Sequence, residues 1–317
     1  MRRGRCRGRG DHDVTFRSGF ACLVGRPNVG KSSLTNALVG QKVAITSERP
    51  QTTRHAIRGI VNRDAAQLIL VDTPGLHKPR TLLGERLNDI VRTTWSEVDT
   101  VGLVLPADQK PGPGDRYLAE QLASLRRAGV VLVVNKMDLV DKASGAAVLA
   151  AAHAMCLAAG LTPDDVVPVS ALSGDNVEVL GDVLVASLPA GPALYPAGVL
   201  TDEPEETLVA ELIREAALAG VREELPHSIA VTVEEMVARP DRPEGKPLLD
   251  VHATIHVERD SQKPIVIGRG GSRLKQIGAD SRAQIQALLG TPVYLHLHVR
   301  VAKEWQRDPK QLRRLGF

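Results

Sequence analysis

The octapeptide GRPNVGKS, residues 25–32, constrains the fold of this chain more than any other feature of its sequence. It fits the pattern G-x-x-x-x-G-K-[ST] and lies between the apolar run Phe20–Val24 and a helical pattern. The glycines let backbone N–H groups wrap around phosphate oxygens, while the positive end of the following helix faces the same anion. The sequence therefore predicts a phosphate-binding loop between a strand and a helix.

Short apolar runs and helical patterns alternate beyond this loop. Helical spacing recurs in Leu83, Leu87, Ile90 and Thr94, and again in Leu118, Leu122 and Leu125. The candidate strands are Phe20–Val24, Ala56–Val61, Gln67–Val71, Thr100–Leu105, Val130–Val134 and Val166–Val169. This alternation predicts an α/β domain of the P-loop NTPase class, with a mostly parallel sheet covered by helices on both faces.

The length of 317 residues favours more than one domain. We expect a disordered Arg/Gly-rich extension over 1–17, the α/β domain over 18–188, a proline-rich linker over 189–206 and a second domain over 207–317. The extension has two interpretations: an RNA-contacting arm, or a start codon placed too early, with translation beginning near Val14. The second domain is expected to be α+β, with helices at Leu208–Ala219 and Arg282–Leu289 and strands at Ser228–Val233, Val251–Val257 and Tyr294–Val301.

Cysteine usage and hydropathy narrow the class of protein. Cys6, Cys22 and Cys156 form no C-x-x-C pair, which argues against a zinc site or a disulfide framework and fits a reducing cytosol. No apolar run approaches the ~20 residues that span a bilayer, and no apolar stretch follows the basic N-terminus. We therefore expect a cytoplasmic protein.

Four separate segments combine into one nucleotide site. Lys31 is placed to reach the β/γ-phosphate oxygens and Ser32 to ligate Mg²⁺. Asp72 ends an apolar strand, where its carboxylate would hold Mg²⁺ through water, and Gly75 follows where its N–H would approach a γ-phosphate. The complete predicted GTP site is Gly25, Arg26, Pro27, Asn28, Val29, Gly30, Lys31, Ser32, Ser33, Asp72, Thr73, Pro74, Gly75, Asn135, Lys136, Asp138, Ser170 and Ala171.

Selectivity for guanine is indicated by the segment NKMD, residues 135–138, at the end of another apolar strand. The Asp138 carboxylate would accept hydrogen bonds from N1–H and the exocyclic amine of guanine, and adenine offers no such pair. The segment VSA, residues 169–171, would offer a backbone N–H to the guanine O6. The expected ligands are GTP and GDP, with Mg²⁺ as cofactor.

A switch loop is predicted between the phosphate loop and Asp72. In the segment Pro50–His55 the hydroxyl of Thr53, favoured over that of Thr52, would complete the Mg²⁺ shell only while a γ-phosphate is present. Lys31, Thr53 and Gly75 are the catalytic candidates. Ras-like switches place a water-orienting glutamine where this chain has Leu76, so backbone, a partner or a monovalent cation must position the water. Asn28 matches the potassium-binding asparagine of GTPases such as TrmE.

The C-terminal part carries the signature of nucleic-acid binding. Residues 201–258 have a formal charge of −9, whereas residues 259–317 have +8. Within the basic part, VIGRGGSRLKQIG places a G-x-x-G loop between an apolar, strand-like run and a basic helix. In a KH domain such a loop clamps the RNA backbone. The predicted RNA-binding residues are Gly268, Arg269, Gly270, Gly271, Arg273 and Lys275.

Taken together, the motifs GRPNVGKS, QTTRH, DTPGL, NKMD, VSA, VIGRGG and LRRLGF resemble the Era family of bacterial GTPases from Phe20 to Phe317. The resemblance implies a G domain followed by a type II KH domain that binds the 3′ end of 16S ribosomal RNA. It also implies a role in assembly of the 30S subunit, a monomer, and peripheral association with the inner face of the cell membrane. The chain departs from the family in its N-terminal extension and in the linker residues DEPEET.

Three other interpretations stay open. A tRNA-modifying GTPase such as TrmE would need a folate site or a catalytic cysteine near the C-terminus, and no cysteine follows Cys156. A structural RNA-binding protein with an inactive G domain would not need Lys31 or Asp138. A GTPase driven to membrane surfaces by its basic end leaves the G-x-x-G loop unexplained, and the sequence lacks a strongly amphipathic basic helix with aromatic anchors.

Overall fold

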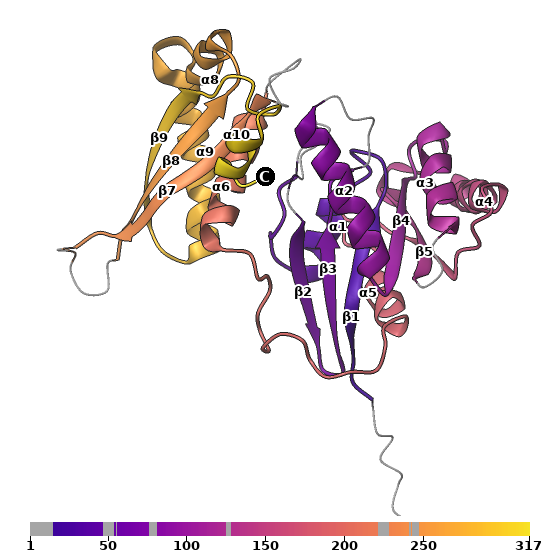
Figure 1. The fold of residues 1–317 in the computed structure, drawn as a ribbon. Helices are drawn as coiled ribbons and strands as arrows, with labels where there is room; N and C mark the ends of the chain where they lie inside the picture. The colour runs from indigo at the N-terminus through magenta and orange to yellow at the C-terminus, as the bar shows by residue number, and fades with distance from the viewer. Residues whose placement is uncertain are drawn as a thin grey trace, which may run out of the picture.

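A computed structural model describes residues 15–46, 54, 56–75, 81–124, 128–220, 228–240, 242 and 247–317. Residues 1–14 of the predicted extension and Leu125 lie outside these described residues. The described chain forms two bodies, one around a six-stranded sheet and one around a three-stranded sheet (Figure 1).

The six-stranded sheet has the order β2-β3-β1-β4-β5-β6. Neighbouring strands are parallel except β2, which runs antiparallel to β3 at one edge. The mostly parallel sheet is confirmed, and the observed strands differ from the predicted ones by a few residues at their ends. The strands are β1 (Arg17–Val24), β2 (Ile57–Arg63), β3 (Ala66–Asp72), β4 (Thr100–Pro106), β5 (Gly129–Asn135) and β6 (Asp165–Pro168).

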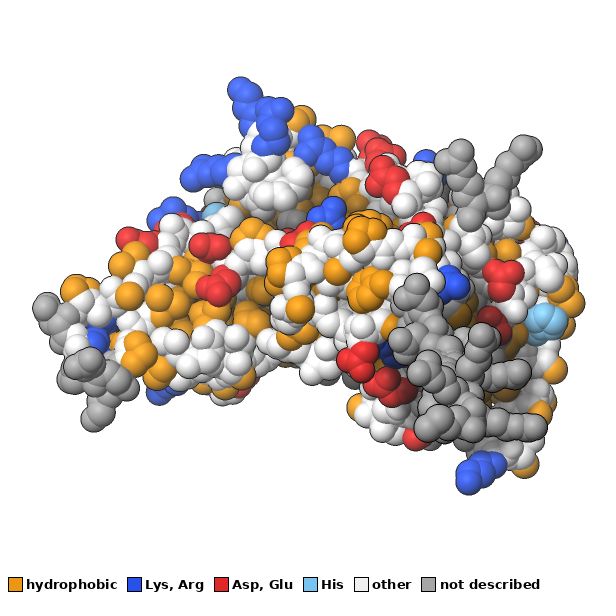
Figure 2. Space-filling view, turned by 90° about the horizontal axis from the view of Figure 1, so that it is seen from below, with side chains coloured by type: hydrophobic (Ala, Val, Ile, Leu, Met, Phe, Trp, Pro, Cys, Tyr) orange, Lys and Arg blue, Asp and Glu red, His pale blue; other side chains and the backbone are white. Residues whose placement is uncertain are grey.

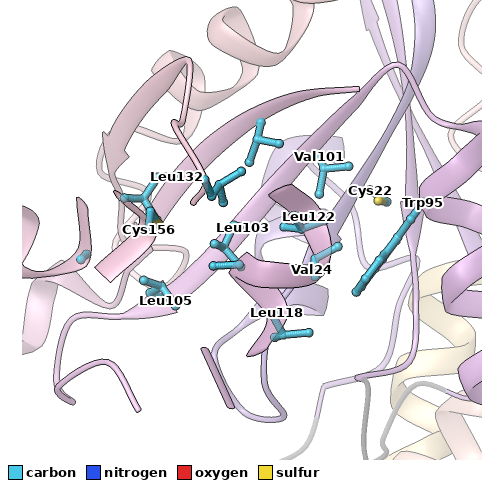
Figure 3. Packing of buried hydrophobic residues seen from close by; sticks show 14 of the residues in the cluster. Cys22, Val24, Trp95, Val101, Leu103, Leu105, Leu118, Leu122, Leu132 and Cys156 are labelled. Atoms are coloured by element: carbon cyan, nitrogen blue, oxygen red, sulfur yellow. The ribbon is translucent and has the colours of Figure 1, made fainter. Parts of the chain in front are cut away.

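Helices cover both faces of this sheet, because alternate residues of its buried strands point in opposite directions. On one face Cys22 and Val24 of β1 pack with Trp95 of α2 and with residues of α3 and α4, as Figure 3 shows for part of this cluster. On the other face Ala21 and Leu23 pack with α1 and α5. The helices are α1 (Lys31–Val39), α2 (Leu82–Glu97), α3 (Pro113–Ala123), α4 (Lys142–Ala158) and α5 (Val177–Ala186).

The second body is an α+β domain whose sheet has the order β7-β8-β9. Strand β8 pairs antiparallel with β7 and parallel with β9. Residues Val251, Ala253 and Ile255 of β8 form a core with α6 and α9, which cover one face of the sheet. The elements are α6 (Glu205–Leu218), β7 (Ala230–Ala238), β8 (Leu249–Val257), α8 (Lys263–Ile267), α9 (Ser272–Leu289), β9 (Val293–Val301) and α10 (Pro309–Arg314).

Some local predictions are wrong. The strand-like run before the G-x-x-G loop is helix α8, because Pro264 sits in its first turn with φ already suited to a helix. The helix expected at Arg282–Leu289 begins at Ser272 and continues without a break. Arg17 belongs to β1 rather than to the extension, since it pairs with Ala66.

The predicted linker ends in a helix and is fastened to the first body. Helix α6 begins at Glu205, inside the predicted linker, because acidic residues in its first turn favour the helix dipole. Asp202 of the linker accepts hydrogen bonds from Arg58 at 2.8 Å and from the Tyr195 hydroxyl at 2.7 Å. The linker is therefore held against strand β2, along whose edge it passes in Figure 1.

A small apolar cluster joins the two bodies. Leu83 and Leu87 of α2 pack against Trp305 and Leu312 of the C-terminal segment. The Leu83 N–H also donates to the Gln306 carbonyl oxygen at 3.1 Å. None of the helices in the described part of the chain combines the length and apolarity needed to cross a bilayer.

Candidate nucleotide site and nucleic-acid interface

The phosphate loop has the tight backbone that its glycines predict. Gly30 has φ of +97°, and Asn28 also has positive φ, at +66°. A Cβ at Gly30 would lie 2.3 Å from the Asn135 side-chain nitrogen, so only glycine fits there. Helix α1 begins at Lys31, directly after the loop, and its N-terminus faces the place where phosphate oxygens are expected.

Lys31 is buried under the loop. Its ammonium donates hydrogen bonds at 3.1 Å to the carbonyl oxygens of Gly25 and Arg26. Burial lowers the pKa of Lys31 to about 8, while the nearby Asp72 carboxylate acts in the opposite direction. A Cβ at Gly75 would lie 3.5 Å from the Lys31 ammonium, so the backbone of Gly75 lies beside Lys31. This position is needed if the Gly75 N–H and the Lys31 ammonium are to bind the same γ-phosphate.

Two of the residues predicted to hold Mg²⁺, Ser32 and Asp72, fit that ion. The Ser32 hydroxyl donates to the buried carboxylate of Asp72 at 2.7 Å, which joins the start of α1 to the end of β3. A hydroxyl and a carboxylate are hard oxygen donors of the kind that Mg²⁺ binds together with water and phosphate oxygens. Within the described residues no group of three or more His, Cys, Asp or Glu side chains could hold another metal ion.

Asn135 connects the guanine-selecting segments to the phosphate loop. Its amide nitrogen donates to the Val29 carbonyl oxygen at 2.9 Å, and its amide oxygen accepts from the Ala171 N–H at 3.1 Å. The Ser170 hydroxyl donates to Asp138 at 2.6 Å, which orients the carboxylate. Three segments far apart in sequence therefore meet at one edge of the sheet, where β1, β5 and β6 end.

Two predicted site residues use their side chains to support the loop. Arg26 forms an ion pair with the fully buried Asp115 of α3 at 2.7 Å. Lys136 has positive φ, and its ammonium lies 3.7 Å from Asp108. Sequence reasoning missed Asp115, because an acidic residue near a helix start usually serves only as a cap. Pro27, Thr73 and Pro74 lie in the loops around the site, and Ser33 lies in the first turn of α1.

Thr53 and Leu76, the predicted switch residue and the position of the missing glutamine, lie outside the described residues, as do Thr52, Pro50 and His55. Both flanks of the 47–53 segment are described, and both contact the C-terminal domain. Before it, Lys42 donates to Glu215 of α6, and the Thr46 N–H donates to the same carboxylate at 2.8 Å. After it, Arg54 donates to the Ile229 carbonyl oxygen at 2.6 Å. The role of these flanks is visible only in the tertiary structure.

The G-x-x-G loop has a conformation that requires glycine at its first position. Gly268 has φ of +75°, and a Cβ there would lie 2.7 Å from the Cβ of Arg273. Gly270 and Gly271 also have positive φ, but a Cβ on either would face open space. Open space at these two positions leaves the backbone accessible to a nucleic-acid strand.

The basic residues around this loop divide into two groups. Arg269 and Lys275 are exposed beside it, as the prediction requires. Arg273 instead donates to the carbonyl oxygens of Ala217 at 3.2 Å and Ala219 at 3.0 Å, at the C-terminal end of α6. Free carbonyl groups at a helix end attract a cation, so Arg273 supports the fold of the loop in addition to any contact with RNA.

Comparisons with known proteins match both domains. A family model described as "50S ribosome-binding GTPase" matches residues 20–136, and one described as "KH domain" matches residues 224–306. The GTPase Era of Streptomyces coelicolor is 66% identical over 305 residues, 96% of either chain. That of Mycobacterium tuberculosis is 63% identical over 304 residues, which cover 95% of this chain and 99% of the relative.

Solved structures resemble the whole chain as well. A crystal structure of Era in complex with MgGDPNP and nucleotides 1506–1542 of 16S ribosomal RNA superposes with a TM-score of 0.88. It is 36% identical and covers 95% of this chain and 99% of its own. A variant of Aquifex aeolicus Era bound to GDP and AlF4⁻ gives the same TM-score at 35% identity and the same coverage.

Proposed function

Because the chain belongs to the Era family of GTPases, we propose that it is a GTP-timed factor in assembly of the small ribosomal subunit. The domain over residues 18–188 hydrolyses GTP to GDP and phosphate. The domain over residues 207–317 binds the 3′ end of 16S ribosomal RNA. The observation that carries this proposal is the presence, in one chain, of a complete guanine-selecting site and a G-x-x-G loop with an accessible backbone.

The residues of the nucleotide site have separate tasks in hydrolysis. Lys31, the loop N–H groups and Gly75 bind the phosphates and stabilise the charge that develops on the γ-phosphoryl oxygens as water attacks. Mg²⁺ would be held by Ser32, by Thr53 and, through water, by Asp72, and it supplies further stabilisation of that charge. Asn135, Asp138, Ser170 and Ala171 select guanine.

Leu76 stands in the place of the glutamine, and its side chain has no group that could hydrogen-bond the attacking water. We propose that a potassium ion bound near Asn28 contributes positive charge between the phosphates. The positive φ of Asn28 supports this role because it places the residue on the bend of the phosphate loop. Hydrolysis should then be faster in KCl than in NaCl of equal ionic strength, and Asn28→Ala should abolish the difference. Equal rates in both salts would contradict a role for potassium in hydrolysis.

Nucleotide state and RNA binding are coupled through the two flanks of the 47–53 segment. Thr53 is expected to move toward Mg²⁺ only when GTP is bound, and Thr46 and Arg54 border its segment on either side. Since both residues hold the C-terminal domain, a shift of this segment changes how that domain is held. Coupling between the two sites requires this segment to adopt a different arrangement in each nucleotide state.

The remaining expectations concern the cellular context. We propose that the protein is a monomer in the cytoplasm, with peripheral association with the inner face of the membrane. Sedimentation with anionic vesicles tests the association, and analytical ultracentrifugation tests the monomer.

The first experiment measures fluorescence anisotropy of an RNA copying the 3′ end of 16S ribosomal RNA. Binding is compared with a GTP analogue and with GDP, using Gly270→Asp as the control that places a carboxylate in the loop. Tighter binding with the analogue, lost in the control, is expected. Equal binding in both nucleotide states would support the RNA-binding site but contradict control of RNA affinity by the nucleotide. No binding in either state would contradict the 3′ end of 16S ribosomal RNA as the ligand.

A further inference from the structure

Asp115, in the first turn of α3, is a fully buried carboxylate whose two oxygens serve different parts of the domain. Oδ2 accepts from the Gly112 N–H at 2.8 Å, which is a local helix cap. Oδ1 accepts from Nε of Arg26 at 2.7 Å, a contact that spans 89 positions of the sequence. A carboxylate taken out of water is strongly destabilising unless a cation and hydrogen bonds compensate it. The Arg26 guanidinium is therefore the partner that Asp115 requires.

The Arg26 side chain is held at further points of the same segment. Its Nη2 donates to the Gln109 side-chain oxygen at 3.3 Å. Its stem crosses the start of α3 at Gly114, where a Cβ would lie 2.9 Å from the Arg26 Cδ. Figure 2 shows Lys and Arg side chains gathered along one rim of the face in view, where they project into solvent. Arg26 is instead turned toward α3, which leaves 32% of its side chain exposed.

The backbone of Arg26 contacts the group that is expected to bind phosphate. Its carbonyl oxygen accepts from the Lys31 ammonium at 3.1 Å, and the Gly25 carbonyl oxygen accepts from the same ammonium at 3.1 Å. A chain of direct contacts thus runs from Asp115 through Arg26 to Lys31. A site that is ordered before binding loses less conformational entropy when the ligand arrives. A fixed Arg26 therefore favours the binding of phosphate oxygens by the loop and by Lys31.

The residues before Asp115 also reach the base-selecting part of the site, through contacts of another kind. The Ala107 N–H donates to the Asn135 carbonyl oxygen at 2.7 Å, and a backbone contact of this type survives side-chain substitution. Asp108 lies 3.7 Å from the ammonium of Lys136, in a partly exposed pair. Exposed ion pairs contribute little stability. A change at Asp115 is therefore expected to act on phosphate binding and to leave base selection as it is.

We propose that Asp115 is a positioning residue of the nucleotide site, which fixes the phosphate loop around Lys31 through Arg26 and so sets the affinity for the phosphates of GDP and GTP. Because Asp115 is fully buried, it acts through Arg26 rather than on the nucleotide. The inference rests on the GTP-binding part of the proposed function. It is independent of the proposed RNA and of the coupling between the two domains.

The test is a double-mutant cycle with the full chain. Asp115→Asn removes the charge and keeps the shape, whereas Arg26→Met removes the guanidinium and keeps a stem over Gly114. The double variant carries both changes and leaves neither charge of the pair without its partner. Dissociation constants and dissociation rates of a fluorescent GDP are measured in the presence of Mg²⁺. Arg26→Lys, which retains a cation, is the conservative variant.

The matched control is Asp141→Asn. Asp141 is an exposed carboxylate that caps α4 of the same domain by accepting from the Ser144 N–H at 2.9 Å. The control therefore changes a helix-capping aspartate in the same way, but on a different helix. Thermal unfolding of all the variants separates a loss of stability from a loss of nucleotide affinity.

We expect Asp115→Asn and Arg26→Met each to weaken GDP binding about tenfold, the equivalent of one hydrogen bond to a charged group. The double variant should also lose about tenfold rather than about a hundredfold, because both changes break the same contact. Arg26→Lys should retain most of the affinity. The preference for GDP over XDP should be the same in every variant, and Asp141→Asn should bind GDP as the unchanged protein does.

Several outcomes would overturn the positioning role. Additive losses in the double variant would show that the two residues act separately. A lower melting temperature of Asp115→Asn with unchanged GDP binding would leave Asp115 as a helix cap, and an equal loss of affinity in Asp141→Asn would point to stability alone. If the unchanged protein binds no GDP, the GTP-binding part of the proposed function fails. If it binds GDP and Asp115→Asn binds equally well, only the positioning role fails.

Discussion

The guanidinium of Arg54 donates a hydrogen bond to the backbone carbonyl oxygen of Ile229 at 2.6 Å, which ties the end of the predicted switch loop to the C-terminal domain. Arg54 is 2% exposed, and it also lies over the rings of Trp305 and Phe317, 5.5 and 5.9 Å from their centroids. Burial lowers the pKa of Arg54, but a guanidinium starts so high that it stays charged at neutral pH. A cation from the G domain is thus enclosed by the KH domain.

The first prediction concerns this contact. Arg54→Ala should reduce the difference in RNA affinity between the GTP-analogue and GDP states, because one flank of the switch segment no longer holds the C-terminal domain. It should also lower the free energy of unfolding by about 1–3 kcal/mol, the cost of leaving a buried partner unpaired. Anisotropy and chemical denaturation measure the two effects. Arg58→Ala, which breaks only the exposed pair with Asp202, is the control. An unchanged nucleotide dependence in Arg54→Ala would contradict the coupling.

The second prediction concerns protons taken up when nucleotide binds. The pKa of Lys31 is lowered to about 8, so near pH 9 most of the ammonium groups have lost a proton. Phosphate oxygens favour the charged form and raise that pKa. Binding of GDP near pH 9 should therefore take up close to one proton, whereas binding near pH 6.5 should take up none through Lys31. Calorimetry in buffers of different ionisation enthalpy measures the uptake. No uptake near pH 9 would show that Lys31 is already charged in the free protein.

The third prediction concerns base selection. Asp138→Asn should weaken GTP binding on the order of 10- to 100-fold, because an amide offers guanine one acceptor and an unwanted donor. The same amide suits xanthine, which carries a carbonyl oxygen where guanine has its amine. Competition between GTP and XTP measures the change in base preference. Ser170→Ala, which removes only the hydroxyl that orients Asp138, should have a smaller effect and no gain for XTP. Equal loss for both nucleotides in Asp138→Asn would contradict the assignment.

The fourth prediction separates fold from binding in the G-x-x-G loop. Gly268→Ala forces a Cβ to within 2.7 Å of the Cβ of Arg273 at positive φ, whereas Gly270→Ala meets only the backbone penalty. Left-handed backbone, as at Gly270, costs a non-glycine residue roughly 1–2 kcal/mol. Gly268, with φ of 75° and ψ of 171°, has a conformation essentially restricted to glycine, and the clash adds to that cost. Thermal unfolding should therefore show a clearly lower melting temperature for Gly268→Ala than for Gly270→Ala. Equal melting temperatures would mean that the loop rearranges freely.

The fifth prediction concerns Arg273. Because its guanidinium bonds two carbonyl oxygens at the end of α6, Arg273→Ala should destabilise the KH domain by about 1–3 kcal/mol. Arg269→Ala, at an exposed loop position, should leave stability unchanged and weaken RNA binding. Denaturation curves and anisotropy distinguish the two variants. A larger loss of stability in Arg269→Ala would contradict these roles.

Local sequence predicted most of the fold because each strand and helix carries its own pattern. The run VVLVV, residues 130–134, is fully apolar and short, and it forms most of strand β5 as expected. Periodicity misjudged the run before the G-x-x-G loop, where Val266 alone is buried and Pro264 favours a helix. A run of so few residues has too little period to separate strand from helix.

The chemistry of the nucleotide site was determined by the sequence alone. Phosphate loops and guanine-binding segments require fixed residue types at fixed spacing, so Lys31, Asp72 and Asp138 are recognisable without coordinates. Only the tertiary structure decided that Arg54 and Glu215 hold the flanks of the switch segment, and that Arg273 caps α6. These contacts join residues more than 50 positions apart, and no local pattern encodes them. The contacts of Arg54 and Glu215 depend on how two separately specified domains pack against one another, whereas that of Arg273 depends on packing within the C-terminal domain.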